Sequence, residues 1–181
     1  MKIYIVRHGE TDWNSLGLIQ GKIDNPLNQK GIDQAVNLIG DYFKDKNIDH
    51  VITTSLSRAQ KTLYYIMQEN NLNTKVDIND NFIERSFGEM EGKHVDEFYA
   101  CENHNAIKGF ESDIEIEKRS ILGLEQTTKL DVQNVIIVCH SHIMKAILVS
   151  LFNYEYTYKL PNCAIIELDY INGEYQLVKI R

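Results

Sequence analysis

Near its start the chain reads Lys2-Ile3-Tyr4-Ile5-Val6-Arg7-His8-Gly9, and this stretch decides the fold that we predict. Its apolar part, Lys2 to Val6, is typical of a short buried β-strand. Arg7-His8-Gly9 ends the strand and leaves an arginine and a histidine at its carboxyl end. A strand that leads into such side chains indicates an α/β protein whose site lies at one edge of a sheet.

Strand-like and helix-like segments alternate along the rest of the chain. Two more strands are predicted at His50 to Thr54 and Val135 to Cys139, with a weaker one at Lys75 to Ile78. Apolar residues at helical spacing predict five helices. Asn28 caps the first and Ser57 the second, and a short third helix runs from Val95 to Cys101. The last two run from about Ser112 to Lys129, with apolar positions Ile114, Ile121, Leu122 and Leu124, and from Ile143 to Leu151.

The C-terminal part of the chain predicts a hairpin. Asn172-Gly173 is a strong turn signal between the strand-like segments Ala164 to Ile171 and Tyr175 to Ile180. Strands that alternate with helices predict a three-layer α/β/α fold, with a mostly parallel central sheet and the hairpin appended. No repeat or linker divides the 181 residues, so we expect residues 1–181 to form a single domain.

Composition narrows the location and the partners. A net charge of −7 disfavours nucleic acid and anionic membranes as partners, and no apolar run approaches the roughly 18 residues of a membrane span. Cys101, Cys139 and Cys163 lack metal-like spacing, and the apolar start of the chain is too short for a signal peptide. We therefore expect a cytoplasmic protein with reduced cysteines. The oligomeric state stays undetermined.

Three predicted strands lead to basic or histidine side chains. Arg7 and His8 end the first strand, Arg58 follows the second, and His140 follows Val135–Cys139. The carboxyl ends of parallel strands meet at one edge, so these side chains predict an anion site there. A neutral histidine is a candidate nucleophile, and a neighbouring guanidinium binds phosphoryl groups through paired donors. A lone histidine at a strand end would more often be structural, so the grouping carries the prediction.

Six motifs occur in a fixed order along the chain. They are Arg7-His8-Gly9-Glu10-Thr11 with Asn14, Leu18-Ile19-Gln20-Gly21 with Asp24-Asn25-Pro26-Leu27-Asn28, Ser55-Leu56-Ser57-Arg58-Ala59-Gln60-Lys61-Thr62, Glu84-Arg85-Ser86-Phe87-Gly88 with Glu91-Gly92, Gly109-Phe110-Glu111-Ser112 with Arg119, and Val138-Cys139-His140. Together they resemble the histidine phosphatase superfamily, the group that contains the cofactor-dependent phosphoglycerate mutases. The resemblance runs from Lys2 to about Asn162 and implies a phosphoglycerate mutase-like fold.

The resemblance also implies a role for each matching residue. His8 would attack phosphorus and become phosphohistidine, while Arg7, Arg58 and His140 would hold the phosphoryl oxygens. Glu84 would protonate the leaving oxygen and later activate water, which requires a raised pKa from burial or from phosphate charge. The remaining predicted substrate-binding residues are Asn14, Gln20, Gly21 and Ser141.

Two features depart from the family pattern. The family usually has a glycine after the second histidine, whereas this chain has Ser141 and then His142. His142 either reaches the substrate or faces away as an ordinary loop histidine, and we favour the second position. Only sixteen residues separate Gly92 from Gly109, so we predict a short lid at residues 93–110 and an open pocket.

These features favour a metal-independent phosphomonoester hydrolase that acts on a small phosphorylated metabolite and needs no cofactor. One alternative is a phosphoglycerate mutase, in which a second hydroxyl rather than water attacks phosphohistidine. Others are a non-catalytic regulator that binds phosphate esters, and a metallohydrolase built on His140-Ser141-His142 with His8. Glu89 and Glu91 compete with Glu84 as the acid. The sequence does not identify the substrate.

Overall fold

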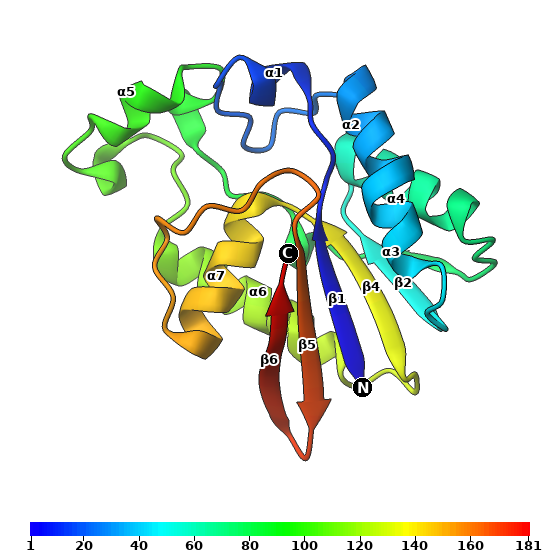
Figure 1. Ribbon diagram of the computed structural model, residues 1–181. Helices are drawn as coiled ribbons and strands as arrows, with labels where there is room; N and C mark the ends of the chain where they lie inside the picture. Colours follow the sequence, from blue (N-terminus) through cyan, green and yellow to red (C-terminus); the bar gives the residue numbers. More distant parts are fainter.

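A six-stranded sheet runs through the centre of the molecule (Figure 1) in the order β3-β2-β4-β1-β5-β6. The computed structural model describes residues 1–181, apart from the side chains at positions 38 and 40. The strands are β1 (Lys2–Arg7), β2 (His50–Thr53), β3 (Val76–Ile78), β4 (Asn134–Cys139), β5 (Ile165–Ile171) and β6 (Glu174–Ile180). Strands β3, β2, β4 and β1 pair in parallel, whereas β5 is antiparallel to β1 and β6 to β5. The predicted, mostly parallel sheet with an appended hairpin is confirmed.

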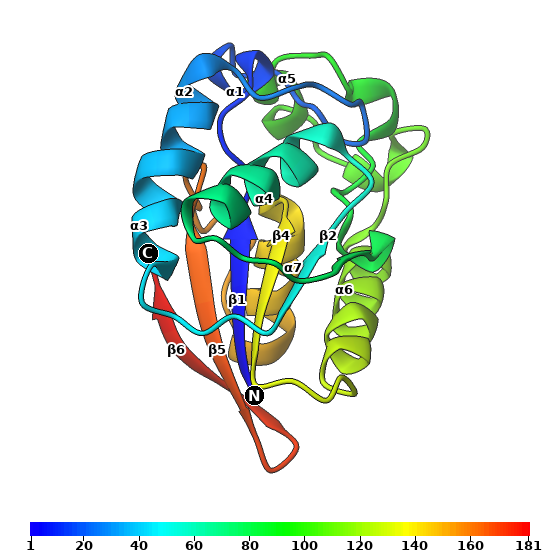
Figure 2. The same cartoon turned by 90° about the vertical axis from the view of Figure 1, so that its right-hand side faces the viewer.

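Helices cover both faces of this sheet (Figures 1 and 2). One face carries α4 (Ser57–Glu69) and a continuous helical run made of α2 (Gln29–Asp33), a π-helical stretch η1 (Gln34–Gly40) and α3 (Asp41–Phe43). The other face carries α6 (Asp113–Thr127) and α7 (Ser141–Phe152). The short helices α1 (Asp12–Ser15) and α5 (Val95–Tyr99) lie beyond the carboxyl ends of the parallel strands, and the 3₁₀ turns are η2 (Asp80–Phe82), η3 (Gly88–Met90) and η4 (His104–Ala106).

Alternation along the central strands divides the core between the two faces. Ile3 and Ile5 of β1 pack with α6 and α7, whereas Tyr4 and Val6 pack with α4 and the helical run from α2 to α3. This is the two-residue period of a strand that is buried on both sides. The sheet is therefore held rigidly, and the residues that follow β1 and β4 start from fixed positions.

Of the three helix starts predicted at Asn28, Ser57 and Ser112, those at Asn28 and Ser112 are correct and the one at Ser57 is wrong. Asn28 caps α2 by accepting the Gly31 N–H at 2.8 Å, and Ser112 forms a capping box with Glu115 at the start of α6. Ser57, however, is the first residue of α4 rather than its cap, because its hydroxyl donates to Asp24.

The predicted apolar face of α6 needs a similar correction. Ile114 and Leu122 are 79% and 44% exposed, whereas Ile116 and Leu124 are fully buried. The face of α6 that packs on the sheet therefore contains Ile116 and Leu124, which lie about two turns apart, and not Ile114 or Leu122.

The hairpin turn is as predicted. Asn172 and Gly173 have φ of 54° and 89°, the left-handed backbone that both central residues of a type I′ turn require.

Helix α7 begins at Ser141, two residues before the predicted start, so Ser141 and His142 belong to a helix rather than to a loop. In the part of the chain that the structure describes, no helix is both long and apolar enough to cross a membrane.

Candidate active site

The predicted catalytic residues come together at the carboxyl edge of the sheet. His8 directly follows β1, His140 directly follows β4, and Arg58 lies in the first turn of α4 after β2. Glu84 reaches the same place from the loop between η2 and η3. Their exposed fractions are 2% for His8, 0% for His140 and Arg58, and 7% for Glu84, so four polar side chains are gathered in one buried place.

The hydrogen bonds of His8 define its tautomer. Its Nδ1 lies 2.7 Å from the carbonyl oxygen of Gly9, and Arg58 donates its Nε–H to His8 Nε2 at 3.3 Å. An arginine N–H can only donate, so we assign the proton to Nδ1 and the free electron pair to Nε2. Burial, followed by the positive charge of Arg58, lowers the pKa of His8 well below its usual value. The imidazole is therefore neutral, with a nucleophilic nitrogen toward Arg58.

Arg58 is fixed by backbone carbonyls of the loop after α1. Its two terminal nitrogens donate to the carbonyl oxygens of Gly21 at 2.7 Å and Ile23 at 2.8 Å. Gly21 has φ of 51°, and a Cβ there would overlap the Glu91 carboxylate. The loop can pass between Arg58 and Glu91 only because this residue is glycine.

Two buried nitrogens beside His8 lack a partner among the described residues. They are Nε of Arg7 and Nδ1 of His140, whose ring centroid lies 5.2 Å from that of His8. Thr54 Oγ1 accepts the Leu56 amide at 3.4 Å and lies 2.9 Å from His140 Nε2, so we assign its hydroxyl proton to that nitrogen and the ring proton to Nδ1. Buried donors without partners are costly, so both nitrogens suit the oxygens of a bound anion.

Glu84 is ionised in this structure. Its Oε1 accepts the backbone N–H groups of Arg85 at 2.9 Å and His142 at 3.1 Å. Burial raises the pKa of Glu84, but the imidazole of His142, whose Nδ1 lies 3.9 Å from Glu84 Oε1, outweighs burial together with the nearby His140 and holds the pKa well below the usual carboxyl value. The expectation that burial supplies a raised pKa is therefore wrong, and only the charge of a bound phosphoryl group is left to raise it.

The two rival carboxylates are placed differently. Glu89 is exposed, and Glu91 Oε1 accepts the backbone N–H groups of Lys22 at 3.1 Å and Phe87 at 3.0 Å. Neither residue lines the cavity at this edge, whereas Glu84 does. The geometry thus favours Glu84 as the acid, which stays a prediction.

A cavity of about 720 Å³ opens above these buried residues. The predicted site residues that line it are Arg7, Asn14, Gln20, Gly21, Glu84 and Ser141. His8, Arg58 and His140 lie beneath this lining rather than in it. The cavity therefore reaches the buried histidines through Arg7 and Glu84.

Asn14 and Gln20 present amide nitrogens to this cavity. Asn14 Oδ1 accepts from Thr11 N at 3.2 Å and from Asn162 Nδ2 at 3.1 Å, and Gln20 Oε1 accepts from Thr11 Oγ1 at 2.9 Å. Their oxygens are thus occupied, while no partner of either NH₂ group is found among the described residues. This arrangement fits the predicted role of Asn14 as a donor.

Two histidines, His104 and His142, line the cavity. His142 lines it beside Glu84, with its ring packed edge-on against Phe87 at a centroid distance of 4.9 Å. The expectation that His142 faces away is wrong because α7 starts two residues early and turns its first residues inward. His104 also lines the cavity, stacked on Phe98 at 3.8 Å.

Other contributors were missed from the sequence. Asn162 donates to the carbonyl oxygen of His8 at 3.2 Å, and Thr62 accepts the Gly9 N–H at 3.0 Å. Asn162 precedes β5, which is antiparallel to β1, so its position depends on strand pairing that the hairpin signal alone does not reveal. Lys145, which also lines the cavity, lies in none of the motifs, and Arg85 lies in one of them without an assigned role.

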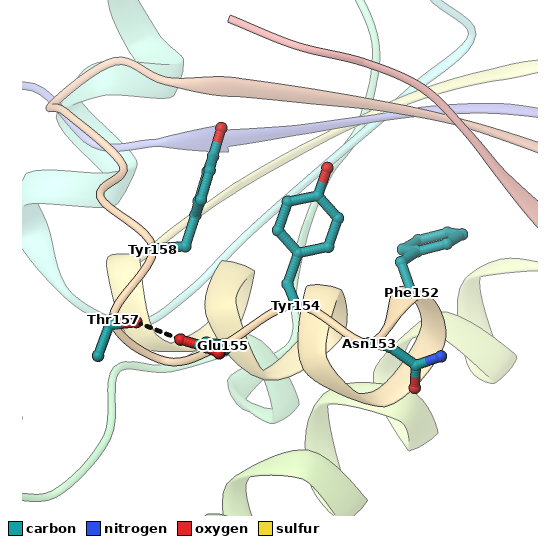
Figure 3. Close-up of a pocket in the computed structure, with 6 residues that line it drawn as sticks. All are labelled: Phe152, Asn153, Tyr154, Glu155, Thr157 and Tyr158. Carbon is teal, nitrogen blue, oxygen red and sulfur yellow. Dashed lines mark hydrogen bonds between the residues drawn. The ribbon is translucent and has the colours of Figure 1, made fainter.

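The residues that the structure describes contain no group of three or more His, Cys, Asp and Glu side chains arranged to hold a metal ion. A second hollow, of about 380 Å³, lies where α7 ends (Figure 3). It is lined by Phe152, Asn153, Tyr154, Glu155, Thr157 and Tyr158. Its aromatic rings and single carboxylate offer nothing that would bind a phosphoryl group.

Comparison with known proteins identifies the class. The family model of the histidine phosphatase superfamily (branch 1) matches residues 3–181. The metal-independent phosphoserine phosphatase of Arabidopsis thaliana is 30% identical over 177 residues, which cover 91% of this chain and 74% of that protein. The chain therefore belongs to the histidine phosphatase superfamily, and the predicted family and enzyme class of histidine-type phosphatases are confirmed.

Solved structures agree with this assignment. A mutant phosphoserine phosphatase from Entamoeba histolytica, in complex with phosphoserine, matches with a TM-score of 0.84 and 25% identity over 99% of this chain and 95% of that one. A phosphoglycerate mutase from Bacillus anthracis matches with a TM-score of 0.89 and 21% identity over 98% and 91% of the two chains. The predicted phosphoglycerate mutase-like fold is confirmed.

Proposed function

We propose that this protein hydrolyses a small phosphomonoester through a phosphohistidine at His8. The observation that carries the proposal is the hydrogen bond from the Arg58 Nε–H to His8 Nε2, which places the electron pair of the ring on that nitrogen, close to unpartnered donors of Arg7 and His140. A nucleophile surrounded by fixed donors is what phosphoryl transfer requires.

In the first step, His8 Nε2 attacks phosphorus and the bond from phosphorus to the ester oxygen breaks. Glu84, protonated when the phosphoryl dianion binds, gives its proton to the leaving oxygen. In the second step, water attacks phosphorus, Glu84 takes the proton of that water, and the P–N bond breaks. The products are an alcohol and inorganic phosphate. His8 is again a neutral ring, and Glu84, which took up a proton from solvent when the dianion bound, returns a proton to solvent when phosphate leaves.

Substrate binding also changes the bond between Arg58 and His8. The Nε–H of Arg58 points at the nitrogen that attacks, so it lies where a phosphoryl oxygen would be held. We infer that the phosphoryl group takes this N–H, together with Arg7 Nε and His140 Nδ1. The exchange frees His8 Nε2 for attack and satisfies both buried donors.

Hydrolysis, rather than transfer to a second hydroxyl, is supported by the segment at residues 93–110. Val95, Phe98, Tyr99 and His104 of this segment line the cavity, but no lysine or arginine from it does so within the described residues. A mutase needs a lid that holds a second phosphate and excludes water. We therefore assign this segment as a short, open lid on a single domain of residues 1–181.

The named relatives suggest the first substrate to test. One is a metal-independent phosphoserine phosphatase and another binds phosphoserine, so O-phosphoserine heads the panel of phosphomonoesters. Free Cys101, Cys139 and Cys163 support our placement of the enzyme in a reducing cytoplasm.

The test is the His8→Ala variant, assayed for phosphate release in the presence of a strong chelator. Wild type should remain active in chelator, and quenched reactions should contain acid-labile, base-stable phosphate on the protein. His8→Ala should show neither turnover nor label, whereas His94→Ala, which alters a half-exposed histidine, should show both. Label on serine or aspartate, or activity that returns only with added metal, would contradict the proposal.

A further inference from the structure

The cavity has a second charged end beyond the phosphoryl site. It is lined there by Arg85, Asp113, Lys145 and Lys159. Arg85 and Asp113 form an ion pair at 2.5 Å, and the Arg85 guanidinium lies over the ring of Tyr156 at 5.0 Å. This pair is balanced in charge, so it leaves the two lysines as the uncompensated charges of that end.

Lys145 is the better placed of these lysines. It is 8% exposed, whereas Lys159 is exposed at the rim. Lys145 lies four residues after Ser141 on α7, so both share one face of the helix, with a rise of about 6 Å between them. The backbone of Lys145 is therefore about one helical turn from Ser141, and both residues line the same cavity.

The ammonium of Lys145 lacks a partner inside the protein. No hydrogen bond or ion pair connects it to any side chain that the structure describes. Burial lowers the pKa of Lys145, although the charge of Glu84 opposes this effect. The Lys145 Nζ keeps contact with solvent although the rest of the residue is buried, so this unpaired ammonium faces the cavity that the residue lines and is placed to pair with an anion there.

We propose that Lys145 binds a carboxylate of the substrate, so that the enzyme prefers phosphomonoesters that carry a carboxylate a few bonds from phosphorus. This inference rests on the proposed function and names its substrate class. Among the residues that the structure describes, Lys145 is the one buried lysine at this end of the cavity, since Lys159 is exposed, and a single ammonium matches a monoanion such as a carboxylate.

The test compares two ligands that differ only in the carboxylate, O-phosphoserine and O-phosphoethanolamine. Their dissociation constants are measured by titration calorimetry on the His8→Ala protein, which cannot turn them over. We expect this protein to bind O-phosphoserine at least tenfold more tightly. When Lys145→Met is added to the His8→Ala protein, the ratio of the two dissociation constants should fall close to one. When Lys145→Arg is added instead, most of the preference for O-phosphoserine should remain.

The matched control is Lys44→Met, which removes the same charge from an exposed lysine outside the cavity lining and should leave the ratio unchanged. Equal binding of both ligands, or a ratio that survives Lys145→Met, would overturn the inference. Hydrolysis of an aryl phosphate by the wild type is measured in parallel. Activity there, combined with equal binding, refutes the role of Lys145 alone, whereas no activity refutes the proposed hydrolase itself.

Discussion

Single side chains at this site take their protonation states from burial and from fixed partners. His8 is neutral because it is buried beside Arg58, and Glu84 is ionised because the imidazole of His142 and the nearby His140 outweigh the effect of burial on its pKa. The protein thus has its nucleophile ready before substrate arrives. Its acid, in contrast, becomes protonated only once phosphoryl charge is present.

The Glu84→Gln variant tests whether Glu84 transfers the proton. Glutamine keeps an oxygen for both backbone N–H groups, so the local structure should persist while proton transfer is lost. We expect kcat on alkyl phosphates to fall by about 10²–10⁴-fold with little change in phosphate affinity. The loss should be smaller on aryl phosphates, whose leaving oxygens need less protonation.

Glu89→Gln is the matched control, because Glu89 is an exposed carboxylate five residues along the same loop. It should retain wild-type turnover on both kinds of substrate. If Glu89→Gln lost most of its turnover while Glu84→Gln kept nearly all of it, Glu89 rather than Glu84 would be the acid.

Motif order was sufficient to group the main site residues, but their surroundings needed three-dimensional structure. Arg7, His8, Arg58 and His140 could be grouped because each follows a strand that the apolar pattern reveals. Lys145 could not, because a lysine on a helix is usually solvated and its burial depends on how α7 packs. The sequence also could not show why residue 9 is a glycine: a Cβ at Gly9 would overlap the backbone of Gly31.

Among the elements, α7 and the segment at residues 93–110 shape the site most. Helix α7 sets its first turn against Glu84, since the His142 N–H donates to that carboxylate. The opposite wall comes from α5 and η4, where Phe98 stacks on His104. Helix ends were predictable where a side chain caps them, as at Asn28. They were missed where, as at His140, no side-chain cap exists.

The short, open lid that we propose at residues 93–110 leads to a prediction about the reaction. Supplied with 3-phosphoglycerate and a trace of its bisphosphate, the enzyme should release phosphate without efficient formation of 2-phosphoglycerate. The reason is that Lys93 and Lys108, the lysines of this segment, do not line the cavity and cannot hold a second phosphate there. Both isomers and free phosphate are followed over time. Rapid isomer exchange with little free phosphate would favour the mutase alternative.

At the scale of the whole molecule, the sheet and its two covering layers follow from apolar periodicity. Strands β1, β2 and β4 were anticipated from short apolar runs, β3 was only a weak signal because it reads Val-Asp-Ile, and the Asn172-Gly173 turn defined the hairpin of β5 and β6. The position of the hairpin next to β1, rather than at the far edge beside β3, could not be predicted. That choice depends on which edge the connection after α7 can reach.

Burying several histidines as neutral rings makes the stability of the whole fold depend on pH. Burial lowers the pKa of His140 to about 3, and it also lowers the pKa values of His8 and His142. The unfolded chain binds protons at these positions below about pH 6.5, whereas the folded protein does not. Stability is therefore fully present above that pH and should decline as the pH falls toward 3.

The contribution of His140 can be isolated between pH 7.5 and pH 5, above the range in which Glu84 loses its own contribution. A pKa change from about 6.5 to about 3 costs roughly 2 kcal/mol of unfolding free energy at pH 5. Urea denaturation should therefore show that His140→Gln loses about 2 kcal/mol less than wild type over this interval. His94→Gln, which alters a half-exposed histidine, should follow wild type. If His140→Gln shows the same pH dependence as wild type, then His140 is protonated in the folded protein, and its assignment as a neutral donor to the phosphoryl group is wrong.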